Sequence, residues 1–149
     1  MKNKSILKIS FIAMFAAIIS FSSFLKIPLG PIPIVLQNMF CILCAVLIGG
    51  ILGSAPVALF LFAGLIGLPV YSGFTSGIAV WVGPTGGFLA GYFLGALIAS
   101  LIAGSPKVQE KKISAKTAIK ISIAILCGMI IIYIPGVIHF AKWATAFSR

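Results

Sequence analysis

The stretch from Gly83 to Gly104, GPTGGFLAGYFLGALIASLIAG, carries no charge and is long enough for a helix that crosses a membrane. Glycine disfavours helices in water, but in lipid a stripe of small residues lets a neighbouring backbone come close. The stretch therefore predicts a central, tightly packed membrane helix and indicates little about function. The small residues recur at every fourth position: Gly87, Gly91, Gly95, Ala99 and Ala103.

The rest of the chain also has the composition of a membrane protein. Of its 149 residues, 61% are hydrophobic and 8% are charged, which is too few charges for the surface of a soluble domain of this size. The apolar segments are longer than barrel strands, which alternate over about ten residues. We predict an all-α, polytopic membrane helix bundle that forms one domain over residues 1–149. The five expected spans are residues 6–24, 35–52, 55–68, 85–103 and 118–134.

Two terminal segments need separate interpretation. The first apolar segment follows lysines, as a signal peptide would, but its "SFSSF" end is a poor cleavage site and further spans follow, so it is interpreted as a retained span. The tail, residues 135–149, looks too short and broken to span. It could lie at the membrane interface as an amphipathic helix, with Trp143 as an anchor.

The net charge of +10 comes from lysines between the apolar segments, which argues against nucleic acid as a partner. Lysines are enriched on the cytoplasmic side of membrane proteins, so their distribution predicts the orientation. A cytoplasmic N-terminus leaves only Lys26, Lys142 and Arg149 outside. It places the larger group inside: Lys2, Lys4, Lys8, Lys107, Lys111, Lys112, Lys116 and Lys120.

This orientation makes the 69–84 connection an outer loop, and its composition is unusual. The loop is rich in glycine and apolar, and the segment before it, residues 55–68, would form only about 21 Å of helix against about 30 Å of hydrocarbon. Irregular backbone persists at membrane depth only where protein or a water-filled cavity satisfies it. A folded lid or re-entrant loop is therefore favoured over a plain solvated loop.

The start of the 85–103 helix, Gly-Pro-Thr-Gly-Gly, has two interpretations. Thr85, Gly86 and Gly87 could direct free N–H groups at an anionic or carbonyl oxygen, as the ends of broken helices do in transporters. Alternatively, the motif is a simple helix start, with Pro84 in the first turn. Four further side chains would lie beside this turn if the outer loop folds back, and they complete the candidate ligand site: Gln37, Asn38, Tyr71 and Trp81.

The chain lacks the residues that most enzymes require. It has no aspartate, its single glutamate is Glu110, and it contains no Walker-type phosphate loop, so it cannot use ATP by itself. Cys41 and Cys44 form a C-x-x-C pair, but buried cysteine commonly acts as a small hydrophobic residue, and a metal site usually needs four ligands. We expect no catalytic residues, no metal and no cofactor.

Three sequence segments resemble the BioY family: "GPIPIVLQNMF", "GLIGLPVYSGFTSGIAVWVGPTGGFLAGYFLGALIA" and "IIIYIPGV". These proteins are the biotin-binding S components of energy-coupling-factor (ECF) transporters. The resemblance covers about residues 10–143 and implies a six-helix bundle in a prokaryotic cell membrane, with an outward-facing biotin pocket capped by loops. It also implies that Ala13 and Ala17, a small-residue pair on the first helix, dock on a transmembrane coupling subunit that works with two ATPases.

The chain departs from the family pattern at its end. The resemblance implies a sixth helix whose aspartate and lysine contact biotin, whereas this sequence ends in "HFAKWATAFSR". We therefore expect the sixth helix to be missing and biotin binding by this chain alone to be weak or absent. The alternative function is a small structural or pore-forming membrane protein of the holin type, built by self-association of glycine-rich helices. It would not require the apolar outer loop.

Overall fold

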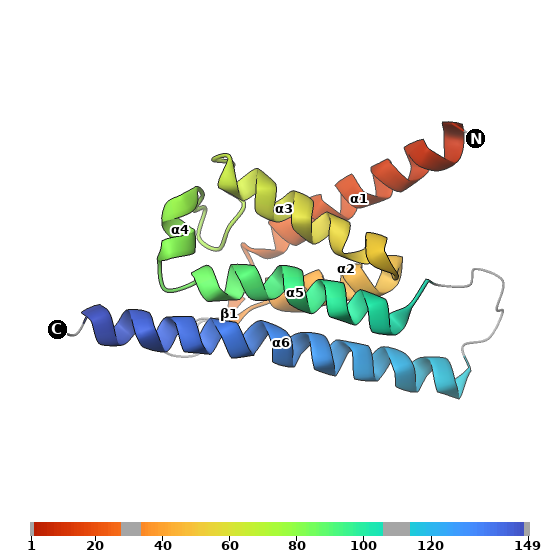
Figure 1. Ribbon diagram of the computed structural model, residues 1–149. Helices are drawn as coiled ribbons and strands as arrows, with labels where there is room; N and C mark the ends of the chain where they lie inside the picture. Colours follow the sequence, from red (N-terminus) through yellow and green to blue (C-terminus); the bar gives the residue numbers. More distant parts are fainter. Residues whose placement is uncertain (1, 28–33, 106–113, 148–149) are drawn as a thin grey trace.

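The computed structural model describes residues 2–27, 34–105 and 114–147. In this part the protein is all-helical apart from one two-residue strand pairing, which confirms the predicted fold class. Figure 1 shows the long helices lying roughly along one axis, except that the start of α1 leans away from the others, while the short α4 lies across this direction. Several residues named above lie outside the described part: Lys107, Glu110, Lys111, Lys112 and Arg149.

The first two helices are joined through the strand pairing. Helix α1 (Lys2–Ser22) matches the first expected span. Strands β1 (Lys26–Ile27) and β2 (Ile34–Val35) pair antiparallel, with Lys26 opposite Val35, and lead directly into α2. Helix α2 (Gln37–Ile48) ends four residues earlier than predicted, because Gly49 and Gly50 adopt positive φ angles of 67° and 61° and turn the chain.

The third helix is short, as the sequence predicts. A 3-10 turn, η1 (Ile51–Ser54), leads into α3 (Ala55–Leu65), which has 11 residues and a proline in its first turn. The following loop contains a helix that the sequence analysis did not expect, α4 (Ile78–Val82). Helix α5 (Gly86–Ala103) then begins within one residue of the predicted start and ends at the predicted residue.

The last helix differs from the prediction. Helix α6 (Ala115–Phe147) runs for 33 residues and includes Pro135. The tail that was expected to be a separate segment at the interface therefore continues the last spanning helix as far as Phe147. Proline removes one backbone N–H from a helix, and membrane helices tolerate this where a neighbouring helix packs against the same turn. Helix α5 supplies that neighbour, because Gly87 lies directly against the Pro135 carbonyl.

Helices α5 and α6 form the most extensive helix pair and lie side by side in Figure 1. The small-residue stripe of α5 faces α6 at backbone distance. A Cβ built on Gly91 would lie 2.7 Å from the Ile132 carbonyl oxygen, and one on Gly95 would lie 2.7 Å from the Gly128 carbonyl oxygen. Ala99 continues the stripe and is fully buried. The two backbones therefore meet along most of α5.

The exterior of the bundle is apolar, as a membrane protein requires. Three helices among the described residues are long and apolar enough to cross a membrane, namely α1, α5 and α6, and the shorter apolar helices are α2 and the η1–α3 unit. Large side chains such as Phe21, Phe62 and Leu126 are more than half exposed on the outside. The buried core lies between α2, α3, α5 and α6.

The two ends of the bundle differ in character. The starts of α1 and α6, the η1 turn and the end of α5 lie at one end, while α4, β1 and the end of α6 lie at the other (Figure 1). Lys8, Lys116 and Lys120 lie on the elements at the first end, which we call the lysine end. The predicted ligand-site residues belong to the second end, which we call the loop end. The assignment of the lysine end to the cytoplasm stays a prediction.

Candidate functional site

A polar cluster lies inside the loop end, where α2, α5 and α6 meet. The hydroxyl of Tyr92 donates a hydrogen bond to Asn38 Oδ1 at 2.7 Å, and Asn38 Nδ2 donates to the hydroxyl of Tyr133 at 3.3 Å. Asn38 and Tyr92 are buried, while Tyr133 is 39% exposed. Asn38 is thus held by one tyrosine from each neighbouring helix, and the cluster opens on the Tyr133 side.

Sequence reasoning predicted Asn38 but missed both tyrosines. Tyr92 lies within an uncharged spanning segment, where the sequence does not distinguish it from other large side chains that face lipid or the core. Tyr133 lies in the equally apolar α6. The available signal was their chemistry, because a tyrosine hydroxyl buried in a membrane bundle needs a polar partner. The partner could not be identified without knowing which faces of the helices meet.

Gln37 is the neighbour of Asn38 at the start of α2. It is 1% exposed, and its Nε2 atom finds no hydrogen-bond partner among the described residues. A buried donor without a partner costs roughly 1–3 kcal/mol, so such groups are rare in folded proteins. Gln37 therefore holds a donor that an added acceptor, such as a ligand oxygen, would satisfy.

The loop that follows α3 folds back onto that helix. The Gly77 N–H donates to the Gly64 carbonyl at 2.8 Å, and the Tyr71 N–H donates to the Thr75 carbonyl at 3.1 Å. At its tip, Phe74 stacks on Phe24 at the end of α1, with ring centroids 4.4 Å apart. The loop is therefore a folded structure attached to both α3 and α1, as the lid interpretation expects; its movement over a ligand stays a prediction.

Tyr71 and Trp81 fix the interior of this loop. The Tyr71 hydroxyl donates to the Leu61 carbonyl at 2.6 Å and accepts a hydrogen bond from Trp81 Nε1 at 3.1 Å. The Tyr71 ring lies against Gly64, where a Cβ would come within 2.2 Å of it. Burial raises the pKa of the Tyr71 phenol above its ordinary value, and the hydrogen bond from Trp81 partly opposes this effect.

The Gly-Pro-Thr-Gly-Gly turn is packed tightly against its surroundings. The Gly86 N–H donates to the Gly83 carbonyl at 3.1 Å, so this amide is not free in the way that the oxygen-binding interpretation assumed. A Cβ on Gly86 would collide with the Trp81 carbonyl. His139 Nε2 lies 3.0 Å from the Gly83 carbonyl and joins the turn to α6. The glycines at this helix start allow close packing, while a ligand role for Thr85, Gly86 and Gly87 stays a prediction.

The hydrogen bonds and packing contacts divide the predicted ligand residues into two groups. Tyr71, Trp81 and Gly86 belong to the folded loop and the turn beside it, whereas Asn38 belongs to the polar cluster. Gln37 is the buried neighbour of Asn38 in the chain. Helix α5 is common to both, because it begins at the turn and carries Tyr92 into the cluster. The loop end thus carries both a polar cluster and an apolar, folded loop, and a site for a small polar-headed molecule needs both kinds of surface.

The other predicted surfaces can be located as well. Ala13 and Ala17 are exposed on α1, whereas Ala16 and Ile19 of the same helix are buried against the bundle. The small-residue pair therefore lies on an unpaired side of α1. Cys41 and Cys44 are buried free cysteines, and the described residues contain no group of three potential metal-ligating side chains.

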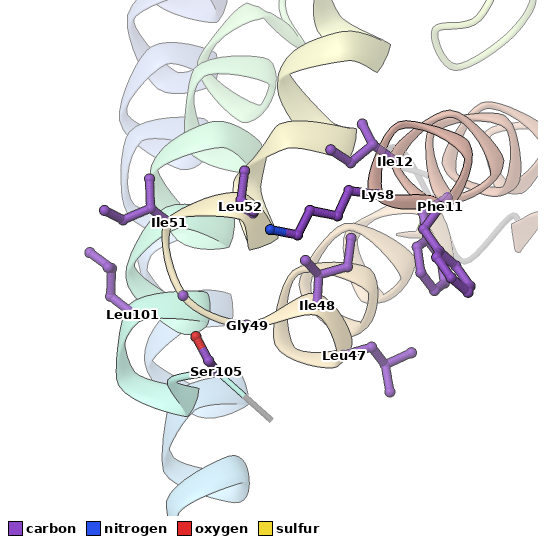
Figure 2. Close-up of a pocket in the computed structure, with 12 residues that line it drawn as sticks. Lys8, Phe11, Ile12, Leu47, Ile48, Gly49, Ile51, Leu52, Leu101 and Ser105 are labelled. Atoms are coloured by element: carbon purple, nitrogen blue, oxygen red, sulfur yellow. The ribbon is translucent and has the colours of Figure 1, made fainter. Parts of the chain in front are cut away.

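A cavity of about 960 Å³ lies at the lysine end, away from all the predicted ligand residues. Its walls come from α1, the end of α2, η1 and the end of α5 (Figure 2). Lys8 is the charged residue of its lining. This cavity was not predicted from the sequence, because its walls come from three segments that are distant in the chain: residues 8–15, 47–52 and 101–105.

The fold and the polar cluster define a class: a multi-pass membrane protein with a buried, hydrogen-bonded polar cluster at one end of a helix bundle. The comparison with known families then identifies it. Residues 1–148 match the model of the BioY family, and the chain belongs to that family. It is therefore a multi-pass protein of the cell membrane, and the family confirms the prediction of a transport protein rather than an enzyme.

Individual relatives agree with this assignment. The chain is 40% identical over 124 residues to the biotin transporter BioY of Thermotoga maritima, covering 83% of this chain and 68% of the relative. It is 31% identical to a probable biotin transporter BioY of Pyrococcus horikoshii, covering 91% of this chain and 75% of the relative. A crystal structure of the S component for biotin from an ECF-type ABC transporter is 28% identical, with a TM-score of 0.82, covering 97% of this chain and 77% of that one.

Proposed function

We propose that this chain is the substrate-binding S component of an ECF-type vitamin transporter and that it captures biotin from outside the cell. The family match and the likeness to a solved S component for biotin support the transport class and the ligand. The polar cluster at the loop end supports a site for one small molecule with hydrogen-bonding groups.

The observation that carries the proposal is the unpartnered donor of Gln37. A biotin ureido group presents a carbonyl oxygen, which can accept a hydrogen bond from Gln37 Nε2. Forming that bond would offset the desolvation of this buried donor, which is worth about 1–3 kcal/mol. Asn38 would keep its two tyrosine partners and hold its own orientation fixed beside the ligand.

The folded loop would serve as the lid of this site. Tyr71 and Trp81 are joined by a hydrogen bond, which would help the loop to keep its shape as a lid. Phe74 contacts the end of α1 through ring stacking, which costs little to break and reform. Thr85, Gly86 and Gly87 would form the edge of the recess where the lid joins α5.

The proposed partners are a transmembrane coupling subunit and two cytoplasmic ATPases. The chain has no phosphate-binding loop of its own, so transport driven by ATP requires other subunits. The exposed side of α1 that carries Ala13 and Ala17 is the proposed docking surface, because small side chains allow a second helix to approach closely in lipid. The single domain is proposed to lie with its lysine end in the cytoplasm.

The binding test is a titration of the purified chain with labelled biotin. Replacing Gln37 with leucine removes the donor and keeps the volume similar, so we expect biotin affinity to fall about 5- to 150-fold. Ser122→Ala, on an exposed part of α6, is the control and should leave affinity unchanged. Equal affinities for Q37L and the control would contradict the assigned site.

The transport test uses cells that contain the coupling subunits. Thr85→Val and Gly87→Leu are each expected to lower uptake of labelled biotin, because they change the turn that joins the proposed lid to α5. Unchanged uptake in both variants would remove these residues from the site. The prediction that residues 1–149 alone bind biotin weakly comes from the resemblance, and nanomolar binding in the titration would contradict it.

A further inference from the structure

The cavity at the lysine end has the chemistry of a lipid site. Its walls are mainly large apolar side chains from α1, α2 and α5, including Phe11, Phe15, Leu47 and Leu101. Its volume of about 960 Å³ is at the upper end of the range of about 300–1,000 Å³ for ligand pockets. An apolar cavity of this volume can hold a hydrocarbon chain.

One cation lies in this apolar setting. Figure 2 shows Lys8 extending from α1 toward Leu52 and Ile48 on the opposite wall. No charged residue occurs from Ile9 to Leu25, so Lys8 lies where the hydrocarbon-spanning part of α1 begins. Lysine at such a position extends its charged end toward the lipid head groups, and its apolar stem lies along the hydrocarbon.

The described part of the chain offers no acid to neutralise Lys8. The sequence has a single acidic residue, Glu110, and it lies outside the described residues. A second cation, Lys120 of α6, lies nearby. Its Nζ atom is 3.4 Å from the position that a Cβ on Gly104, just after the end of α5, would occupy. Gly104 precedes Ser105, whose side chain lines the same cavity. Among the described residues, this end of the bundle therefore carries cations and no anion.

We propose that this cavity binds one anionic phospholipid, with its phosphate paired to Lys8 and one acyl chain along the Phe11–Phe15 side of α1. The residues that line the cavity favour an anionic phospholipid over two other ligands. A soluble phosphate would leave the apolar walls unused, and a neutral lipid would leave Lys8 unpaired. A lysine near the surface of an anionic membrane contributes about a fivefold preference for the charged lipid.

The proposal does not depend on biotin binding, and it is tested without biotin. The full chain is reconstituted in nanodiscs containing equal parts of phosphatidylglycerol and phosphatidylcholine, released, and weighed by native mass spectrometry. We expect one retained lipid per chain, with phosphatidylglycerol favoured about fivefold. Adding inorganic phosphate should not displace it, because the acyl chain provides much of the contact.

Three substitutions make the test specific. Lys8→Gln should reduce the preference to near equality, and Lys8→Arg should keep it, because arginine keeps the charge. Lys116→Gln is the matched control, since Lys116 is an exposed lysine at the same end but does not line the cavity. Equal losses in K8Q and K116Q, or no preference in the unmodified chain, would overturn the proposal. So would a dimer mass that disappears in K8Q, because the occupant would then be a second copy of the chain.

Discussion

Replacing Gly91 with alanine tests the closest approach between two helices of the bundle. A Cβ at this position would lie 2.7 Å from the Ile132 carbonyl oxygen and 3.0 Å from the Ile132 Cα. Both are backbone atoms of α6 and cannot rotate away. Helices α5 and α6 would therefore have to separate by about 0.7 Å to reach ordinary contact distance, and this would weaken dispersion contacts along the interface.

The magnitude follows from two opposing effects. Alanine is favoured over glycine in a helix by about 1 kcal/mol. Overpacking of a filled core costs about 1–3 kcal/mol, and the upper part of this range applies because the atoms that must move are backbone. The cost of overpacking should exceed the gain in helix propensity, so the free energy of unfolding should fall by about 1–2 kcal/mol. In a helix with an open face the same substitution would stabilise the protein.

Gly128→Ala is the matched comparison on the facing helix. A Cβ at Gly128 would lie 3.0 Å from Ala99 Cβ and from the end of the Ile42 side chain, and 3.2 Å from the Gly95 carbonyl oxygen. These contacts are tight but can relax by small shifts, and the gain in helix propensity offsets them. The stability of G128A should therefore stay within about 0.5 kcal/mol of the unmodified chain.

The assay uses the chain's own cysteines. Cys127 is free and only half-buried, so it is replaced by serine in every variant. Cys41 and Cys44 are buried and free, so a thiol-reactive fluorophore labels them only when the bundle opens. Unfolding in mixed micelles, followed by this labelling as dodecyl sulfate increases, gives the difference between the variants. If G91A is as stable as the unmodified chain, or more stable, the argument that α5 and α6 meet backbone to backbone at Gly91 is wrong.

Three further predictions concern the loop end and α1. Tyr71→Phe removes the hydrogen bond to Leu61 and the acceptor for Trp81, so hydrogen exchange across residues 70–82 should become about 5- to 10-fold faster. In the unmodified chain, protection of residues 70–82 from exchange, corrected for the intrinsic exchange rate, should hold below about pH 10. It should decline as the pH rises toward the raised pKa of the Tyr71 phenol, because the ionised phenol cannot donate to Leu61. The Y71F variant should lack that decline. Tyr92→Phe leaves Asn38 without its shorter hydrogen bond and should weaken biotin binding in the titration. Ala17→Leu should reduce copurification with the coupling subunit and leave biotin affinity unchanged.

Much of the fold could be predicted from the sequence because lipid imposes simple rules. The uncharged 85–103 segment with glycine at every fourth position has few alternatives to a packed spanning helix, and α5 occupies residues 86–103. The 55–68 segment was too short to span, and α3 is shorter still. The 69–84 loop is too apolar to be exposed to water, and its backbone polar groups would be unsatisfied in lipid. It is folded back on α3, as these two constraints require.

The errors arose where a local signal was overridden by tertiary contact. Pro135 predicts the end of a helix, yet α6 continues through it because α5 packs against the same turn through Gly87. The 35–52 segment was read as one span because its hydrophobicity is continuous, although Gly49 and Gly50 end α2 through positive φ angles. Hydrophobicity alone does not distinguish a turn that is buried in protein from a helix that continues in lipid.

The candidate site could be predicted only in part, for a related reason. Gln37 and Asn38 stood out because they are polar at the end of an apolar segment, whereas Tyr92 and Tyr133 did not. Their importance depends on which helix faces meet. The stripe of α5 that packs on α6 also fixes the rotation of α5, and that rotation directs the Tyr92 hydroxyl toward Asn38.

This dependence connects the packing of the bundle with the proposed site. Gly91 and Tyr92 are adjacent in the chain, so a substitution that moves the α5 backbone away from α6 also moves the tyrosine that holds Asn38. G91A should therefore weaken biotin binding as well as stability, while G128A should affect neither. If G91A destabilised the bundle yet bound biotin with full affinity, the site would have to lie away from the polar cluster, and the assignment of Gln37 and Asn38 would fail.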